Sequence, residues 1–416
     1  MENKRKLVKL KDLAKNINSG ITPSRTNNNY WDNGTIFWLK TEQLGAFKIY
    51  ATSEKISEVA LNETSIKIFP INTLAIAMYG EGKTRGNVSI LKAEMATNQA
   101  CCNIVLDEKK ADYEFVYYFL KTQYHQLRSL SSGVRKNLNS NDIKEFEISI
   151  PENLDTQRRI ATVLSTLDAK IELHQKLNAE LEAMAKTLYD YWFVQFDFPD
   201  AEGEPYKSSG GSMTFSKELN RKVPTGWEVG VLSDVANITM GQSPPGESYN
   251  EIQEGIIFFQ GCTDFGTRFP SIRQYTTVPS RIAQKGDILL SVRAPVGTMN
   301  IANNKCCIGR GLAALNGIKN TTPYLFGILN NFKIIFDRRN VNGTTFGSIT
   351  KEDLFSLQVV IPYDDVLLKY QNILNPIFEK QNQIEQETQQ LQQLRDWLLP
   401  MLMNGQVEVG STSFSS

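Results

Sequence analysis

Two long amphipathic stretches, at residues 152–195 and 363–404, constrain this chain of 416 residues more than any other feature. In the second stretch, apolar side chains recur every seven residues with others between them: Ile377, Ile384, Leu391 and Leu398, with Leu394 and Met401. The first stretch carries a similar stripe that slips once: Ile160, Leu164, Leu167, Ile171, Leu177, Leu181, Met184, Leu188 and Tyr191. Such spacing predicts helices that pack on one another. A helix of about 40 residues would be roughly 60 Å long, which suits a spacer better than one small core.

The segments that precede the two stretches also match each other. The paired landmarks keep their order along the chain: Leu10 and Asp12 with Leu232 and Asp234, Gly20 with Gly241, residues 35–38 with 256–259, residues 74–77 with 288–291, Gly133 with Gly343, Asp142 with Asp353, and Pro151 with Pro362. Only small insertions separate them. The sequence therefore predicts a tandem duplication of a globular region followed by a long helix.

The duplication sets the expected domain boundaries. We expect globular regions at 1–151 and 227–362, long helices at 152–195 and 363–404, a linker rich in Pro, Gly and Ser at 196–226, and a tail at 405–416. Strands are expected at 35–39, 73–78 and 146–150, and helix at 113–130. Because each globular region mixes strands, turns and helices, the expected fold class is α+β. Antiparallel packing of the long helices would relate the two regions by an approximate two-fold axis.

Composition excludes several classes of protein. Lys plus Arg equals Asp plus Glu, so a wholly basic nucleic-acid binder is disfavoured, although charge can still be segregated on the surface. The five cysteines form two adjacent pairs and a single, which fits neither a disulfide framework nor a zinc site and favours a reducing cytoplasm. With two histidines, a histidine-based metal site is not expected, and no apolar run reaches the length of a membrane span.

Two short segments suggest chemistry that their context does not support. Residues 80–85 read Gly-Glu-Gly-Lys-Thr-Arg, but Ala77 stands where a phosphate-binding loop needs its first Gly, and the matching residues 291–298 contain no Gly-Lys-Thr. Residues 375–378 read Asn-Pro-Ile-Phe, part of the tetrapeptide of adenine methyltransferases, without its second Pro. We interpret Asn375 as a helix N-cap and Pro376 as the first helical residue.

Polar residues in the turns of both globular regions are candidates for DNA contact, because Arg, Lys, Asn and Gln in loops read base edges or hold phosphates. In the first region they are Thr22, Arg25, Asn28, Tyr30, Lys40, Thr41, Gln43, Lys83, Arg85, Asn98, Gln99, Arg135 and Lys136. In the second they are Gln242, Ser243, Tyr249, Gln260, Arg293, Arg310, Thr344 and Thr345. For any single residue, a solvated turn remains the alternative.

The long helices are not basic, and the second is rich in glutamine. They are therefore poor candidates for following DNA. We interpret them as a spacer whose outer faces contact protein partners, with a merely solvated face as the alternative.

The chain resembles the specificity subunit of type I DNA restriction–modification systems along nearly its whole length. The resemblance is carried by an ordered set of short segments: Gly-Ile-Thr-Pro at Gly20, Thr-Asn-Gln-Ala at 97–100, Ile-Gly-Arg-Gly-Leu-Ala-Ala at 308–314, Pro-Thr-Gly-Trp-Glu at 224–228, the linker segment at 198–211, and Leu-Pro-Met-Leu-Met-Asn-Gly-Gln at 399–406. The start of the first helix resembles the family at 157–160, and the corresponding residues 368–371 match less well.

The resemblance implies a non-catalytic DNA reader with target recognition domains at 1–151 and 227–362. Each domain would read one half of a bipartite double-stranded site, and the paired helices would set the gap between halves. Two methyltransferase subunits using S-adenosylmethionine would dock on the chain, and motor–nuclease subunits using ATP and Mg would add restriction. No cofactor is expected in this chain. Two other hypotheses remain open: a coiled-coil scaffold with protein-binding ends, and a nucleotide-dependent enzyme built on the loop at Lys83.

Overall fold

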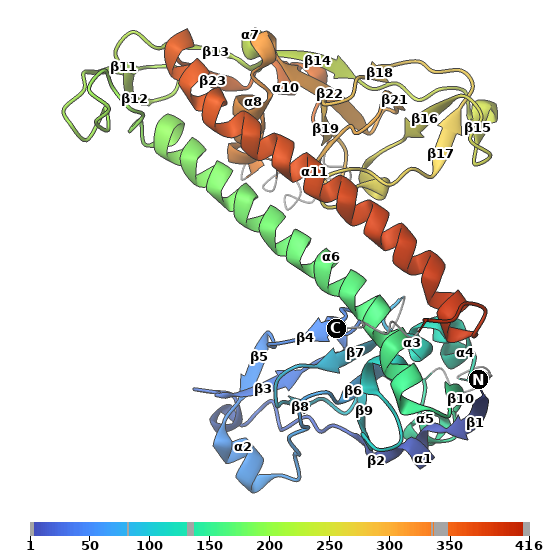
Figure 1. Cartoon of the computed structure of the whole chain (residues 1–416). Helices are drawn as coiled ribbons and strands as arrows, with labels where there is room; N and C mark the ends of the chain where they lie inside the picture. The colour runs from blue at the N-terminus through green and yellow to red at the C-terminus, as the bar shows by residue number, and fades with distance from the viewer. Residues whose placement is uncertain (1–3, 81–82, 131–136, 334–335, 337–347, 411–416) are drawn as a thin grey trace, which may run out of the picture. The chain divides into compact units, whose positions relative to one another are not determined.

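The structure is a computed structural model that describes residues 4–80, 83–130, 137–333, 336 and 348–410. Its contacts form two compact units, unit 1 (Met1–Glu172 with Gln389–Ser416) and unit 2 (Leu173–Thr388). Two long helices, α6 (Leu154–Tyr189) and α11 (Asp364–Met403), contribute residues to both units (Figure 1). The compact units therefore include parts of the helices, which the sequence assigned to separate segments.

Unit 1 contains three sheets and several short helices. A five-stranded sheet has the order β2 (Ala14–Ser19), β9 (Cys101–Leu106), β6 (Leu74–Ala77), β7 (Val88–Leu91), β4 (Lys48–Ile49). A three-stranded sheet has the order β5 (Glu54–Ile56), β3 (Ile36–Leu39), β8 (Ala96–Thr97), and β1 (Arg5–Lys9) pairs with β10 (Glu147–Pro151). The helices are α1 (Leu10–Leu13), α2 (Glu58–Glu63), α3 (Tyr113–Thr122), α4 (Tyr124–Ser129) and α5 (Ser140–Lys144), with 3-10 turns η1 (Asn28–Tyr30) and η2 (Thr41–Gln43).

Unit 2 is built in the same way. A four-stranded sheet has the order β14 (Ala236–Met240), β22 (Leu312–Gly317), β19 (Ile288–Ser291), β20 (Met299–Ile301). A five-stranded sheet has the order β15 (Tyr249–Asn250), β17 (Gln274–Thr276), β16 (Ile256–Phe259), β21 (Cys306–Ile308), β18 (Ile282–Ala283), and β13 (Glu228–Val231) pairs with β23 (Gln358–Ile361). The helices are α7 (Leu232–Val235), α8 (Thr322–Asn331) and α10 (Lys351–Phe355), with short turns η3 (Asp190–Val194), η4 (Gly246–Ser248), η5 (Cys262–Asp264) and η6 (Ile318–Asn320). The segment expected as a linker holds a hairpin of β11 (Met213–Ser216) and β12 (Arg221–Pro224).

The strand orders repeat between the units. The order β2-β9-β6-β7 recurs as β14-β22-β19-β20, and β5-β3-β8 recurs as β17-β16-β21. This recurrence and the mixture of sheets and helices confirm the α+β fold class. One detail of the sequence alignment is wrong by one residue, because Leu39 and Phe259 occupy the same position, opposite Thr97 and Ile308. Lys40 therefore corresponds to Gln260.

The same capping device also appears in both units. The Asn139 side chain accepts from the Asp142 N–H at 3.0 Å, and the Asp142 carboxylate accepts from the Asn139 N–H at 3.1 Å. Thr350 and Asp353 exchange the same two bonds in front of α10. Each reciprocal pair satisfies orphan donors at a helix start, so the chain leaves the preceding loop at a defined residue.

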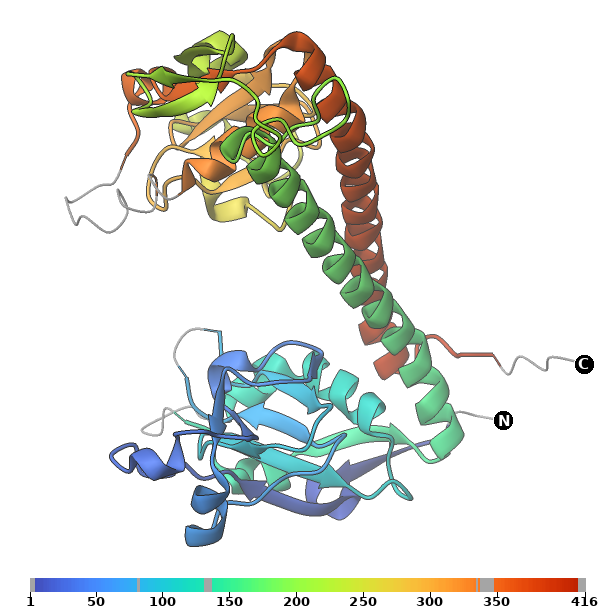
Figure 2. The same cartoon turned by 90° about the vertical axis from the view of Figure 1, so that its left-hand side faces the viewer.

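Each compact unit buries one part of both long helices (Figures 1 and 2). In unit 1, Ile160 and Leu164 of α6 join the core together with Leu402 of α11. In unit 2, Tyr189 at the end of α6 joins the core together with Tyr370 near the start of α11. Residues later in α6 contact residues earlier in α11, so the two helices pack antiparallel within each unit.

The side chains that line this helix packing differ from the expected apolar stripe. Met184 and Leu394 are 56% and 44% exposed. Polar side chains occupy buried positions instead: Asp168, His174, Asn178, Gln381, Glu385 and Thr388. They bond one another, as with the His174 ring nitrogen and the Thr388 hydroxyl at 3.1 Å.

One local prediction is wrong. Asn375 and Pro376 do not start a helix, because α11 runs continuously through them. Burial of Leu374 and packing of Ile377 and Phe378 against the unit 2 core offset the hydrogen bond that proline removes.

The helical stretch expected at 113–130 is confirmed. It consists of two helices, α3 and α4, with Gln123 between them outside the helical region of φ and ψ.

Candidate nucleic-acid interface

Three segments of unit 1 meet at one edge of its sheets. The chain leaving β2 is bonded to the loop before β9, with Ile21 N to Thr97 O at 2.9 Å. That loop bonds in turn to the chain leaving β6, with Met78 N to Ala100 O at 2.8 Å. The segment that leads into α5 joins them, with Leu138 N to Met78 O at 3.1 Å. We call this region the loop edge of unit 1.

Unit 2 has the same loop edge with the same bonds. Gln242 N donates to Ile308 O at 3.0 Å, Val292 N to Gly311 O at 3.0 Å, and Ile349 N to Val292 O at 2.9 Å. The two units therefore present equivalent sets of loops. Those predicted DNA-contacting residues that the structure describes lie on these loops or on the turns beside them.

A glycine in each unit allows this close meeting of loops. A Cβ on Gly20 would lie 2.1 Å from the carbonyl oxygen of Thr97. A Cβ on Gly241 would lie 2.1 Å from the carbonyl oxygen of Gly309. In both cases the obstacle is a backbone carbonyl oxygen, so any larger residue requires the loops to separate. This explains why the two glycines stand out in the sequence repeat.

Two expected DNA-contacting cations of unit 1 share one carboxylate. The Arg25 guanidinium lies 3.7 Å from the Trp31 ring centre, and its Nη1 is 2.6 Å from Glu54 Oε2. Lys40 Nζ is 2.7 Å from Glu54 Oε1. The hydrogen bonds from Arg25 and then Lys40 lower the pKa of Glu54. The structure thus brings Arg25 and Lys40 together around one carboxylate, which offsets one of their two positive charges.

Apart from Lys83 and Arg85, the other described candidates of unit 1 fall into four places. Asn28 and Tyr30 belong to η1, Thr41 and Gln43 belong to η2, and Thr22 follows the Gly20 turn. Gln43 is engaged locally, because its Oε1 accepts from Ser53 at 3.3 Å. Asn98 and Gln99 stand at the tip of the loop before β9, where Gln99 is exposed. The buried Oδ1 of Asn98 has no hydrogen-bond partner among the described residues.

Four candidates of unit 2 form one connected cluster. The Ser243 hydroxyl accepts from Gln260 Nε2 at 2.9 Å and from the Arg310 backbone N–H at 3.3 Å, and Gln242 is adjacent. Tyr249 is used structurally, because its hydroxyl donates to the Pro244 carbonyl at 2.9 Å. The cluster therefore offers amide and guanidinium groups at the place where unit 1 has Lys40.

The remaining candidates lie on the hairpin loops after β6 and β19. Lys83 and Arg85 follow β6, and Arg293 follows β19 and forms a β-bridge with Ser348. Four further candidates lie outside the described residues: Arg135, Lys136, Thr344 and Thr345.

A basic groove beside the hairpin loop of unit 1 was missed by sequence reasoning. Its cavity of about 670 Å³ is lined by residues of this loop and of α3 and α4, including Lys83, Lys121, His125 and Arg128. The cations of α3 and α4 fall on a segment that looks, in sequence, like an ordinary helix with a solvated face. Only the packing of α4 against the loop shows that they line the same cavity.

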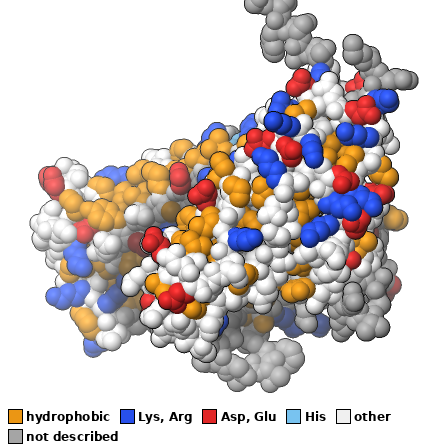
Figure 3. Space-filling model, turned by 90° about the horizontal axis from the view of Figure 1, so that it is seen from below, with side chains coloured by type: hydrophobic (Ala, Val, Ile, Leu, Met, Phe, Trp, Pro, Cys, Tyr) orange, Lys and Arg blue, Asp and Glu red, His pale blue; other side chains and the backbone are white. Residues whose placement is uncertain are grey.

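Charge is not segregated into large fields on the face seen in Figure 3. Lys and Arg side chains lie beside Asp and Glu side chains there. Local clusters such as the one at Glu54 show the same pairing of opposite charges. On this face, DNA binding would therefore depend on local groups of cations rather than on a broad positive field.

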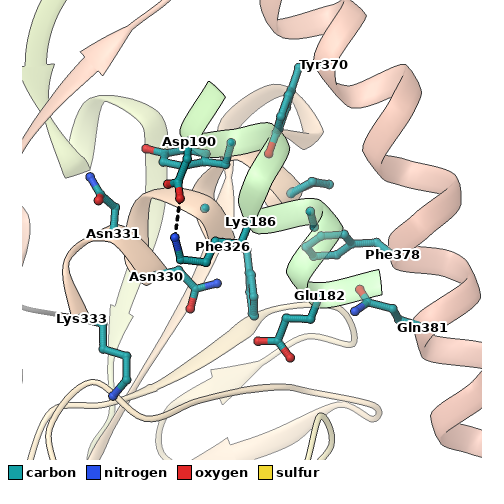
Figure 4. A pocket seen from close by; sticks show the side chains of 14 residues that line it. Glu182, Lys186, Asp190, Phe326, Asn330, Asn331, Lys333, Tyr370, Phe378 and Gln381 are labelled. Carbon is teal, nitrogen blue, oxygen red and sulfur yellow. Dashed lines mark hydrogen bonds and ion pairs between the residues drawn. The ribbon is translucent and has the colours of Figure 1, made fainter. Parts of the chain in front are cut away.

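A second cavity, of about 230 Å³, lies in unit 2 between α6, α8 and α11 (Figure 4). Phe326 of α8 and Phe378 of α11 meet edge to face across it, with ring centres 5.5 Å apart. Lys186 and Asp190 form an ion pair at its rim. Mostly apolar walls suit an apolar side chain better than a nucleotide.

The described residues contain no set of His, Cys, Asp and Glu side chains that could hold a metal ion. Cys101, Cys102, Cys306 and Cys307 are buried free thiols, and burial raises the pKa of Cys102 to about 12. Within the part of the chain that is described, no helix is long and apolar enough to cross a membrane.

Sequence comparison defines the class to which this duplicated fold belongs. The family model described as the type I restriction modification DNA specificity domain matches residues 2–183 and 224–395, so it covers both copies of the repeat. The chain belongs to this family.

Particular relatives agree with this assignment. The chain is 27% identical to the type I restriction enzyme MjaIX specificity subunit of Methanocaldococcus jannaschii, over 96% of this chain and 93% of that protein. It is 22% identical to the type I restriction enzyme HindI specificity subunit of Haemophilus influenzae, over 73% of this chain and 78% of that protein. The fold is similar to the crystal structure of a type I restriction–modification S subunit from M. genitalium, with a TM-score of 0.62, 19% identity and 96% of each chain covered.

Proposed function

We propose that this chain is the sequence-reading subunit of a type I restriction–modification complex, and that each unit reads one half of a bipartite DNA site. The observation that carries the proposal is the recurrence of the loop edge in the two units, joined by equivalent backbone hydrogen bonds. Equivalent scaffolds that carry different side chains suit two half-sites of different sequence. In unit 1 the loops carry Lys40 and Asn98, and in unit 2 they carry Gln260 and Arg310.

The long helices would set the gap between the half-sites. Their 36 and 40 residues correspond to roughly 54 and 60 Å of helix. Each helix contributes buried side chains to both compact units, so its length is tied to the fold of each. A matched insertion of whole turns in both helices is expected to lengthen the gap.

In this function the chain binds DNA and partner proteins without catalysing a reaction. Methylation would be carried out by two methyltransferase subunits with S-adenosylmethionine, and restriction by motor–nuclease subunits with ATP and Mg. The expected location is the cytoplasm, where such complexes meet DNA. Support for the partners comes from the relatives, which are named as specificity subunits of type I restriction enzymes.

A protein-binding scaffold remains the second candidate, and the cavity of unit 2 favours it. Phe326 and Phe378 of this cavity offer apolar surface that suits an apolar side chain of a partner protein. The two functions are compatible if this surface serves the methyltransferase. A measurement of DNA binding distinguishes the two functions, because a protein that is only a scaffold does not bind DNA. If the chain were a nucleotide-dependent enzyme built on the loop at Lys83, it would bind ATP, and Lys83→Ala would abolish that binding.

An exchange of recognition segments tests the proposal. Residues 227–362 are replaced with the equivalent segment of a relative that has a different methylation site, and the methylated sequence is determined with the same methyltransferase. We expect one half of the site to change while the other half and the gap stay the same. A matched exchange of residues 1–151 should change the opposite half. Simultaneous change of both halves in either hybrid would contradict independent reading by the two units.

A further inference from the structure

The basic groove of unit 1 has a composition that fits a polyanion. The residues that line it come from the turn at Gly45, the hairpin loop between β6 and β7, and helices α3 and α4: Gly45, Lys83, Gly86, Asn87, Val88, Lys121, Tyr124, His125 and Arg128. Three of these side chains are cationic, and none of the described lining residues is acidic.

Lys121 is a partly buried cation of the groove, with the ammonium 5.7 Å from the Tyr117 ring centre. Burial lowers its pKa and the charge of Arg395 lowers it further, whereas the charges of Asp168 and Asp396 act in the opposite direction. Among the residues that the structure describes, Lys121 forms no ion pair with either carboxylate. A cation that burial desolvates gains more from an incoming anion than a solvated lysine would.

Arg128 is held at the other side of the groove. Its Nη1 donates to the Arg85 carbonyl at 2.9 Å and to the Tyr124 hydroxyl at 3.0 Å. The Tyr124 hydroxyl donates in turn to the Lys83 carbonyl at 2.8 Å. These bonds fix the guanidinium against the loop, so its charge is oriented before any ligand binds.

The counterpart in unit 2 has a mixed charge. Asn330 of α8 occupies the helical position that Lys121 has in α3, the ninth of ten residues in each. The corresponding cavity of about 310 Å³ is lined by Asn330, by the cations Arg268 and Lys333, and by the acidic Glu182. A carboxylate therefore stands among the cations of that cavity, whereas none of the described lining residues of the unit 1 groove is acidic.

We infer that the groove of unit 1 binds the phosphodiester backbone of the DNA, with Lys121 and Arg128 as phosphate contacts. The inference rests on the proposed function and adds a backbone contact that the predicted base-reading residues do not supply. The groove adjoins the hairpin loop that leaves the loop edge at Met78, so a strand read there can extend over it. Phosphate contacts carry affinity and register but no sequence information. The open shape and the separate cations suit an extended backbone.

The test measures the salt dependence of DNA binding by the full chain assembled with its methyltransferase subunits. Two duplexes are used, one with the methylated site and one without it, across a series of KCl concentrations. Lys121→Met keeps the stem that packs near Tyr117 and removes the charge, and Arg128→Gln removes the second charge. We expect the slope of log K against log salt to fall by about 0.9 for each variant and about 1.8 for the pair. Affinity should fall by the same factor for both duplexes.

Matched variants keep the test specific. Lys109→Gln removes an exposed lysine in the turn after β9, at the end of that strand away from the loop edge, and its slope should equal wild type. Lys121→Arg keeps the charge and should retain the wild-type slope, whereas Lys121→Met should not.

Each contrary outcome has a distinct meaning. Unchanged slopes in both neutral variants, or loss confined to the duplex that carries the site, would overturn the groove as a backbone contact. Binding of ATP that Lys121→Met weakens, with DNA slopes unchanged, would overturn it in favour of a free nucleotide. Failure of the wild-type complex to bind either duplex would count against the proposed function itself.

Discussion

Arg395 of α11 and Asp168 of α6 form a buried ion pair within unit 1 whose loss should loosen that unit. Arg395 Nη1 is 2.6 Å from Asp168 Oδ1, and the Tyr118 hydroxyl donates to Asp168 Oδ2 at 2.7 Å. The side chains of Asp168 and Arg395 are only 5% and 19% exposed. Arg395→Met leaves the carboxylate buried with a single hydroxyl partner. Removing one member of such a pair costs about 3–5 kcal/mol.

The assay is hydrogen exchange of the full chain, followed in the amides of α3. Because two compact units need not unfold together, a single melting temperature would not isolate unit 1. A loss of about 3 kcal/mol in the free energy of opening should speed exchange of α3 roughly a hundredfold, with little change in α8.

Two controls define what the result means. Arg158→Met removes an exposed cation on α6, whose Asp155 partner is also exposed, and should change exchange little. The triple change Tyr118→Phe, Asp168→Leu, Arg395→Met removes all the buried polar groups and should recover most of the protection. Exchange of α3 in Arg395→Met within about threefold of wild type would refute the argument that the ion pair stabilises unit 1.

Three further predictions follow from the loop edges and the surface. Gly241→Ala places a Cβ 2.1 Å from Gly309 O and should abolish methylation that depends on the half-site read by unit 2. Circular dichroism should show that the fold persists. Normal methylation by this variant would contradict the prediction. Glu54→Gln removes the one carboxylate that Arg25 and Lys40 share and should raise the salt slope of DNA binding by up to about 0.9; an unchanged slope would show that neither cation reaches DNA. Hydrogen bonds from Lys11 and then Lys9 lower the pKa of Glu145 to about 2, so its stabilisation is present above its unfolded pKa and is lost as the pH falls through about 2. Acid titration of Glu145→Gln should therefore show a shallower loss of stability below about pH 4.5 than wild type, and less difference at high salt; parallel curves would contradict it.

The repeat and the fold class could be predicted because they depend on patterns of residues within short segments of the sequence. A run such as residues 74–77 is buried on both faces and reads as a strand in any context. The landmarks at Gly20 and Gly241 mark places where backbone atoms leave no room for a side chain. Each of these features lies within a short segment of the sequence, so it can be found without knowing which distant segments it contacts.

The helix packing could not be predicted in detail because its buried positions are partly polar. A search for apolar spacing selects Met184 and Leu394, and it passes over Asp168 and Thr388. Those polar side chains are buried only because partners on the other helix satisfy them, and partner identity depends on register between segments about 200 residues apart. The slip in the first stripe was the sequence signal of this arrangement.

The candidate site was predictable as a set of loops but not as a set of charges. Sequence reasoning named Arg25 and Lys40 as separate candidates for DNA contact, whereas in the structure both pair with Glu54. It missed Lys121 and Arg128, because their shared groove forms only when α4 packs on the hairpin loop. The alignment error at Leu39 has a related cause, since a one-residue shift in a strand alters which side chain leaves its end.

The most direct test of the account is a long-read map of adenine methylation in cells that express this chain with its methyltransferase, compared with cells that lack only this chain. The account predicts a two-part motif with a fixed gap that is present only when the chain is present. With the methyltransferase intact and expressed, methylation that does not depend on the chain, or a motif with a single part, would contradict two-unit reading.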